Sequence, residues 1–189
     1  MPSFDLRGIR VAKYANNSGT ITYSSHCAAG DAMSTNIDLR FAEGRLYAEG
    51  RLAELIKIAI GGTISVAVKY IPSDAQVLMF GATAVTGNST PAGLKYTSKD
   101  NANYVGCSFY APDKIDGEIM YTCMFLPKVL FGPPSMAFKT KGETITFNTP
   151  TTTGEFLADD SNTQLLIETA TAATEDAAKS WCKGKLGET

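Results

Sequence analysis

One apolar run constrains the fold of this chain more than any other feature. It covers residues 119–131 and ends at the chain breaker Gly132-Pro133-Pro134. A second run, over residues 143–149, alternates apolar and polar side chains with the period of two that marks a half-buried strand. Its outward face is expected to consist of Thr144, Thr146 and Asn148. The stretch 119–160 therefore predicts β-structure with one face in the core and the other meeting water or a neighbouring molecule.

The same periodicity predicts further strands along the chain. Residues 8–14 and 20–23 flank Asn16-Asn17-Ser18-Gly19, which tolerates positive φ, so we expect a hairpin there. A turn sequence at 112–117 leads back into the long apolar run, so the strand before the turn should pair with that run antiparallel. Strands are also predicted at residues 36–41, 63–69, 104–110 and 164–169.

Two short helices are predicted beside the strands. We expect Ser73 to cap a helix that runs to Phe80 and ends at Gly81. Thr174 is expected to cap a terminal helix that ends at Gly184. Their apolar sides are expected to be Val77, Leu78 and Phe80 in the first helix and Ala177, Ala178 and Trp181 in the second.

Composition limits the classes of protein to consider. At 189 residues and 44% hydrophobic positions, the chain can bury one core, so we expect a single domain over residues 1–189. A net charge of −2 argues against a protein that grips nucleic acid, because such affinity comes from clustered Lys and Arg. No run approaches the roughly 18 apolar residues of a membrane span, and no leader is recognisable. We therefore expect a cytoplasmic chain with reduced thiols.

The residues that usually carry chemistry are few. The four cysteines show no CxxC spacing and His26 is the only histidine, so no usual zinc arrangement can be drawn. His26 adjoins Cys27, whereas a nucleophile and its base normally converge from separate elements. Cys107 and Cys123 fall in strand patterns and are expected in the core. Asp159-Asp160 is interpreted as a surface turn, not an acid pair. The sequence thus predicts no catalytic residue, no metal site, no cofactor and no enzyme.

Two polar segments stand apart from the strand pattern. Residues 42–55 mix acidic and basic side chains with glycines, a composition that suits a projecting loop as well as a short helix. A solvated surface and an interface explain this segment equally well. Residues 87–103 are rich in Asn, Ser, Thr, Pro and Lys and are predicted to form a mobile loop.

The stretch 119–160 also carries a family resemblance. Residues 125–129, 138–151 and 157–160 resemble, in order and spacing, the second half of the major tail protein, the tail-tube subunit of phages with long noncontractile tails. The resemblance extends over nearly the whole chain. Further segments that fit the same family are Leu46-Tyr47-Ala48, Gly61-Gly62-Thr63-Ile64, Ile71-Pro72-Ser73-Asp74 and residues 175–181.

The resemblance implies a mainly β tail-tube fold, a β-sandwich or barrel with a flanking α-helix and a short C-terminal helix. In that family six copies close into a ring, rings stack into a tube, and DNA passes down the lumen without specific binding. The implied partners are further copies of the chain, a tape-measure protein, and tail-tip or terminator proteins, with no membrane. The implied location is the virion tail, after assembly in the host cytoplasm.

Contacts between stacked rings are expected from the two polar segments, because these combine charge with glycine. The candidate contact residues in the first segment are Glu43, Arg45, Glu49, Arg51 and Glu54. Charge reversal at Arg45 or Arg51 that left assembly intact would count against this expectation.

One alternative stays open, a β-sandwich binding or decoration module on a virion surface. In that case Tyr96, Tyr104 and Tyr110 would form a ligand face. The alternating pattern around these tyrosines favours packing in the core or in a hairpin instead.

Overall fold

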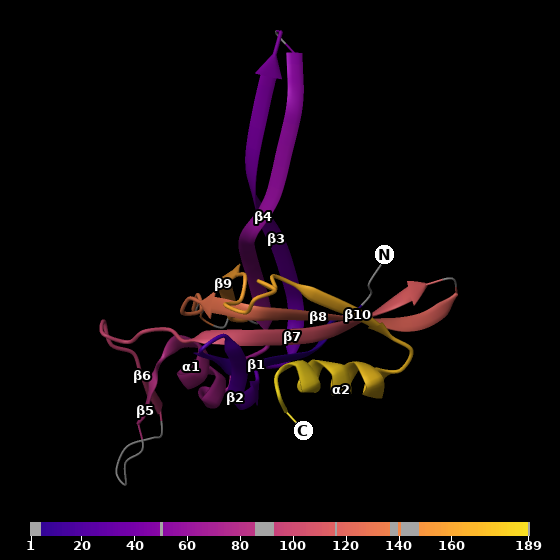
Figure 1. Ribbon diagram of the computed structural model, residues 1–189. Helices are drawn as coiled ribbons and strands as arrows, with labels where there is room; N and C mark the ends of the chain where they lie inside the picture. Colours follow the sequence, from indigo (N-terminus) through magenta and orange to yellow (C-terminus); the bar gives the residue numbers. More distant parts are fainter. Residues whose placement is uncertain are drawn as a thin grey trace.

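The computed structural model describes residues 5–49, 51–85, 93–115, 117–136, 140 and 148–188, and its architecture is mainly β with two helices (Figure 1). Most of the predicted strand 143–149 and of the motif 138–151 lies outside the described residues. The elements are, in chain order, β1 (Arg7–Asn17), β2 (Thr20–Ala28), β3 (Ala32–Ala48), β4 (Arg51–Val68), α1 (Ser73–Phe80), β5 (Thr83–Val85), β6 (Gly93–Lys95), β7 (Tyr104–Ile115), β8 (Glu118–Phe131), β9 (Thr151–Leu157), β10 (Glu168–Ala172) and α2 (Glu175–Lys185).

One antiparallel sheet contains most of the strands. Its order is β2-β1-β7-β8-β9-β4-β3, and β10 pairs with β8 beside that path. The predicted β1–β2 hairpin and the predicted antiparallel pairing of β7 with β8 are confirmed. β5 and β6 form a separate two-stranded ribbon.

The sheet curls, so that strands far apart in its order share one core. Ile9 and Val11 of β1 cluster with Ile64 and Val66 of β4, although three strands separate β1 from β4 in the sheet. α1 adds buried side chains to the same cluster. The other members of this main core include Val68, Ala75, Leu78, Met79, Phe80, Val105, Cys107, Phe109, Leu126, Val129, Phe131 and Phe156.

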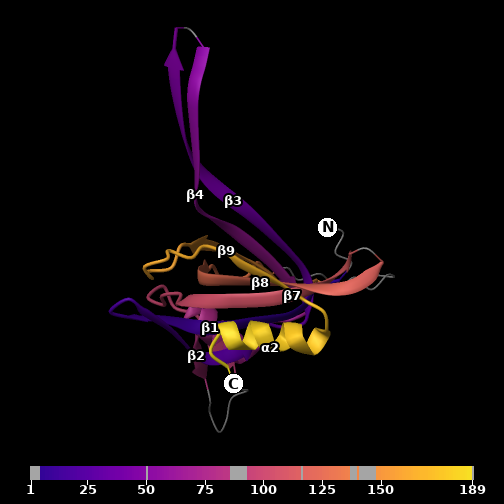
Figure 2. The same ribbon diagram turned by 45° about the vertical axis from the view of Figure 1, so that its right-hand side comes forward.

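Beyond its exposed first residues, β8 is buried on both faces, which explains its mostly apolar sequence. Leu126 and the partly buried Met124 face the main core, whereas Cys123 and Phe125 lie beneath α2. Figure 2 shows α2 running across the outer side of the sheet. Sequence and fold therefore agree at the run that constrains the chain most.

The predicted helices form, with corrections at their ends and on their apolar sides, where Val77 and Ala177 are exposed. Thr174 caps α2 as expected, since its hydroxyl accepts from the Ala177 amide, but α2 continues past Gly184 to Lys185. Gly81 ends α1 in the left-handed conformation, with φ of 72°. Ser73 is not the cap: it is the first helical residue, and Pro72 occupies the cap position without a side-chain hydrogen bond.

The predicted strand 164–169 is displaced toward the C-terminus. β10 begins only at Glu168, and the preceding residues form a turn around Asp159. The Asp159 carboxylate accepts from the Leu165 amide at 2.8 Å and from the Ser161 hydroxyl at 2.6 Å, and Gln164 has φ of 49°. Side-chain hydrogen bonds of this kind compete with strand pairing, so the alternation in the sequence is overridden locally.

Candidate subunit interface: a projecting hairpin arm

β3 and β4 extend far beyond the rest of the sheet as a two-stranded ribbon. Figures 1 and 2 both show this ribbon projecting from the body of the protein. Its ladder continues to the pair Ala48 and Arg51 next to the tip. We call residues 41–49 and 51–59 the arm. The prediction of a loop or short helix over residues 42–55 is wrong in its secondary structure, because the segment is a β-hairpin that projects from the body.

The arm leaves the body at a bulge and a glycine pair. The register shifts between Arg40 and Phe41, opposite Gly61 and Ala59, so one residue of β4 has no direct partner. Bulges of this kind bend a ribbon and increase its twist. Gly61 has φ of 149°, and Gly62 pairs with Phe156 of β9. The body therefore ends where β4 loses β9 as its second neighbour.

One face of the arm is apolar and exposed. Residues directly opposite in an antiparallel ladder lie on the same face. By that rule the pairs Gly44 with Ile56 and Ala42 with Ile58 share a face with Leu46. Leu46, Ile56 and Ile58 are 59%, 53% and 59% exposed, although each is a large hydrophobic residue. We call this the apolar face; beside Gly44 it contains a hollow of about 310 Å³.

The opposite face of the arm carries most of its charges, together with Phe41 and with Leu55, which lies opposite Arg45. Glu43 lies opposite Lys57, and the two form an ion pair at 3.0 Å. Arg45 also contacts Glu43, at 3.3 Å, and the Lys57 ammonium lies 4.6 Å from the centroid of the Phe41 ring. Hydrogen bonds from Lys57 and then from Arg45 lower the pKa of Glu43. We call this the charged face; the Glu43 carboxylate is shared by two cations, Arg45 and Lys57, within the arm.

The remaining candidate residues lie near the tip. Glu49 and Arg51 approach within 3.9 Å, and their side chains are 86% and 82% exposed. Glu54 lies opposite Leu46 and so belongs to the apolar face. The structure thus brings together Glu43 with Arg45 and Glu49 with Arg51, whereas Glu54 lies on the other face. A role for these five residues in contacts between subunits stays a prediction.

Sequence reasoning missed the apolar members of the arm. Ile56 and Ile58 of the arm, and Ile60 just beyond it, alternate with Lys57 and Ala59, which is the period-two signal of a strand. The charged and glycine-rich residues before position 56 obscured that signal, because glycine and mixed charge usually indicate a loop.

Other residues considered in the sequence occupy structural positions. Cys107 and Cys123 are buried, as predicted. His26 Nε2 lies 2.7 Å from the Leu186 carbonyl oxygen, and burial raises the pKa of the adjacent Cys27 to about 11. A thiol with a raised pKa is not an activated nucleophile. Asp160 forms an ion pair with Lys128 at 2.8 Å, whereas the Asp159 carboxylate accepts from the Leu165 amide. The two neighbouring carboxylates therefore make separate contacts.

The three tyrosines of the alternative hypothesis do not form one face. Tyr110 is 4% exposed and donates to Glu175 at the start of α2. Tyr104 lies beneath the Lys128 ammonium at 4.9 Å, and Tyr96 donates to Gln76 of α1. Each ring thus serves a different local contact.

No protein-family model matches the chain, and no curated protein matches it. Within the described ranges, neither helix has both the length and the apolar character needed to cross a bilayer.

Proposed function

We propose that this protein is a structural virion protein, the tail-tube subunit of a phage with a long noncontractile tail. Six copies close into a ring, rings stack into a tube, and DNA passes through the lumen without specific binding. Tape-measure and tail-tip or terminator proteins are the further partners, and the chain performs no catalysis. The chain assembles in the host cytoplasm and functions in the virion tail.

The arm is the observation that carries this proposal. A two-stranded ribbon on its own is marginally stable in water. Leu46, Ile56 and Ile58 are nevertheless more than half exposed on it. Covering a large aliphatic side chain completely contributes about 1.5–3 kcal/mol, so a partner surface over the apolar face would stabilise the arm considerably.

A second copy of the chain suits the arm better than an unrelated partner. The arm projects in one direction from the body (Figure 1). If it contacts a different surface on the next copy, the contact is heterologous, and such contacts generate rings or open stacks. Both modes of assembly are required for a tube built from rings.

The sheet and the charge balance support the same proposal. β2 and β3 are the two ends of the main strand order, so the isolated chain carries strand edges there. Joining edges of neighbouring copies in a ring removes surfaces that otherwise promote aggregation. The net charge of −2 is compatible with a lumen in which DNA slides, because each additional phosphate contact would add drag.

Light scattering and negative-stain electron microscopy at rising protein concentration test the proposal. We expect masses of six copies or more, with six-fold rings or hollow tubes in the images. A chain that stays monomeric at every concentration would count against the tube and favour a binding or decoration module on a virion surface.

A further inference from the structure

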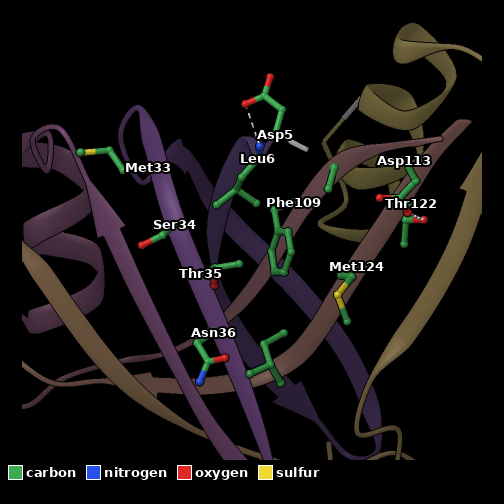
Figure 3. A pocket seen from close by; sticks show the side chains of 12 residues that line it. Asp5, Leu6, Met33, Ser34, Thr35, Asn36, Phe109, Asp113, Thr122 and Met124 are labelled. Carbon is green, nitrogen blue, oxygen red and sulfur yellow. Dashed lines mark hydrogen bonds between the residues drawn. The ribbon is translucent and has the colours of Figure 1, made fainter. Parts of the chain in front are cut away.

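A second cavity lies in the body, between β3 and the β7–β8 pair. Its volume is about 660 Å³ (Figure 3). Phe109, Ala111 and Asp113 reach it from one face of β7, because alternate residues of a strand point the same way. Thr122 and Met124 of β8 complete that wall. The opposite wall is β3 over residues 33–37, and Leu6 lies between the walls. We call this cavity the β3–β7 groove.

The carboxylate of Asp113 is the unusual group in this groove. Asp113 is only 3% exposed. Its Oδ2 accepts from the Thr122 hydroxyl, but its Oδ1 has no hydrogen-bond partner among the described residues. Figure 3 shows the carboxylate between Thr122 and the groove. A buried carboxylate oxygen without a partner is costly, so a hydrogen-bond donor from beyond the described residues would stabilise it.

The lining of the groove defines the chemistry of that donor. Among the described residues, it contains two carboxylates, those of Asp5 and Asp113, and no lysine or arginine. Asp5 at the entrance is already paired with Arg7 at 2.7 Å, so Asp113 is the carboxylate that lacks a cation. Leu6, Phe109 and Met124 supply apolar walls. Carboxylate and apolar walls together suit an arginine or lysine side chain, whose stem packs while its head forms a charged hydrogen bond.

The occupant is expected to be polypeptide and not a small cation. Within the part of the chain that the structure describes, β3 pairs only with β4, so residues 33–37 present a strand edge to the groove. Such an edge offers N–H and C=O groups that another segment of backbone can satisfy. A free ion would leave that edge and the apolar walls uncovered.

The chain itself carries a suitable side chain. On the charged face, Arg45 and Lys57 are both engaged by Glu43 at 3.3 Å or less. Arg51 is 82% exposed, and its guanidinium lies 3.9 Å from the Glu49 carboxylate, the outer limit of an ion pair. Arg51 also lies next to the tip, the part of the arm that can reach furthest from its own body (Figure 1).

We propose that the β3–β7 groove is the receptor for the arm of a second copy of this chain, with Arg51 of that copy paired to Asp113. The inference rests on the proposed function and assigns the surface on which the arm docks. Asp113 is a docking residue, and its isolated carboxylate is the state of the unassembled subunit.

A double-mutant cycle tests the pairing. Asp113→Asn keeps the acceptor for Thr122 but removes the unpaired charge. We expect the melting temperature of the unassembled subunit to stay equal or to rise. The protein concentration needed for assembly should rise about tenfold or more, as for loss of a charge pair buried in an interface. Arg51→Gln should raise that concentration similarly, and the double variant should be no worse than either single variant. Arg40→Gln, at the base of the arm, is the matched control and should assemble normally.

Photo-cross-linking identifies the occupant directly. Benzoylphenylalanine at position 33 on the groove wall, in assemblies of isotopically mixed copies, should cross-link to residues 45–57 of another copy. Normal assembly of Asp113→Asn, or cross-links only to other segments, would overturn the inference while leaving the tail-tube function standing. Failure of the unaltered chain to form any oligomer would overturn both. A fall in the melting temperature of unassembled Asp113→Asn would show a structural role and also overturn the inference.

Discussion

Gly62 lies against the ring of Phe156, so closely that a Cβ built on Gly62 would come within 2.5 Å of a ring carbon. The same Cβ would also meet the Asp38 carbonyl oxygen on β3. Gly62 and Phe156 are partners in the β4–β9 ladder, and Phe156 is fully buried. The pair thus fixes β3, β4 and β9 together at the point where the arm leaves the body.

Gly62→Ala should therefore destabilise the subunit. We expect a loss of about 1–3 kcal/mol in the free energy of unfolding, typical of an overpacked site, because the obstacle includes backbone. Urea denaturation of the unassembled protein measures this loss. Gly44→Ala on the arm is the control, since the nearest atom to its new Cβ is 4.0 Å away, and it should unfold like the unaltered chain. Equal effects at the two glycines would contradict the role of the close approach.

Glu175 should make the attachment of α2 sensitive to acid. Its carboxylate accepts from Tyr110 at 3.0 Å and pairs with Lys179 and Arg7, each at 3.1 Å. The hydrogen bond from Lys179, followed by that from Tyr110, lowers the pKa of Glu175 below its ordinary value of 4.5. A lowered folded-state pKa means that the stabilisation is complete above pH 4.5 and is lost as the pH falls through the lowered pKa.

The test of this dependence is the melting temperature of the unassembled subunit between about pH 7 and pH 3. Glu175→Gln should melt at a lower temperature than the unaltered chain at neutral pH, and the difference should shrink in acid. Asp176→Asn is the matched control, because that side chain is 97% exposed. A difference between Glu175→Gln and the unaltered chain that stays constant with pH would contradict the assignment.

The thiols should react slowly in the native protein. Burial raises the pKa of Cys107 and of Cys182 to about 12 and that of Cys27 to about 11. A rise from 9.0 to about 11 reduces the thiolate fraction at pH 8 about a hundredfold. We expect Ellman's reagent to titrate four thiols after denaturation but to react with native protein mainly at the half-buried Cys27. Cys27→Ser should remove that reaction; rapid labelling of Cys107 would contradict the burial.

The elements predicted correctly are those whose structure is determined by residues close to them in the sequence. The alternation around Ile64 predicts the end of β4, and Thr174 predicts the start of α2, because periodicity and capping act over a few residues. Strand 164–169 was misplaced because the Asp159 carboxylate holds the Leu165 amide in a turn. The alternation of apolar and polar residues carries no information about such a hydrogen bond.

The candidate interface was predicted only in part. The charges of Glu43 and Arg45 drew attention to the right segment, but their polarity indicated a loop. The apolar face depends on the register that places Ile56 opposite Gly44, and register comes from pairing across the hairpin. Asp113 was placed in the predicted turn 112–117, whereas β7 continues to Ile115, and the Asp113 carboxylate is buried beside Thr122 of β8.

The two faces of the arm should differ in their importance for assembly. Ile56→Thr places a hydroxyl on the apolar face while keeping a β-branched residue, so the ladder should persist. Ala59→Thr introduces the same residue three positions along β4, but opposite Phe41 on the charged face.

We expect Ile56→Thr to raise the concentration needed for assembly about tenfold, since removing one buried aliphatic contact costs about 1.5 kcal/mol or more. Ala59→Thr should change it little. Both unassembled variants should retain the melting temperature of the unaltered chain, because residue 56 is already 53% exposed there. Equal effects of Ile56→Thr and Ala59→Thr on assembly would mean that the apolar face is not the surface that a second copy covers.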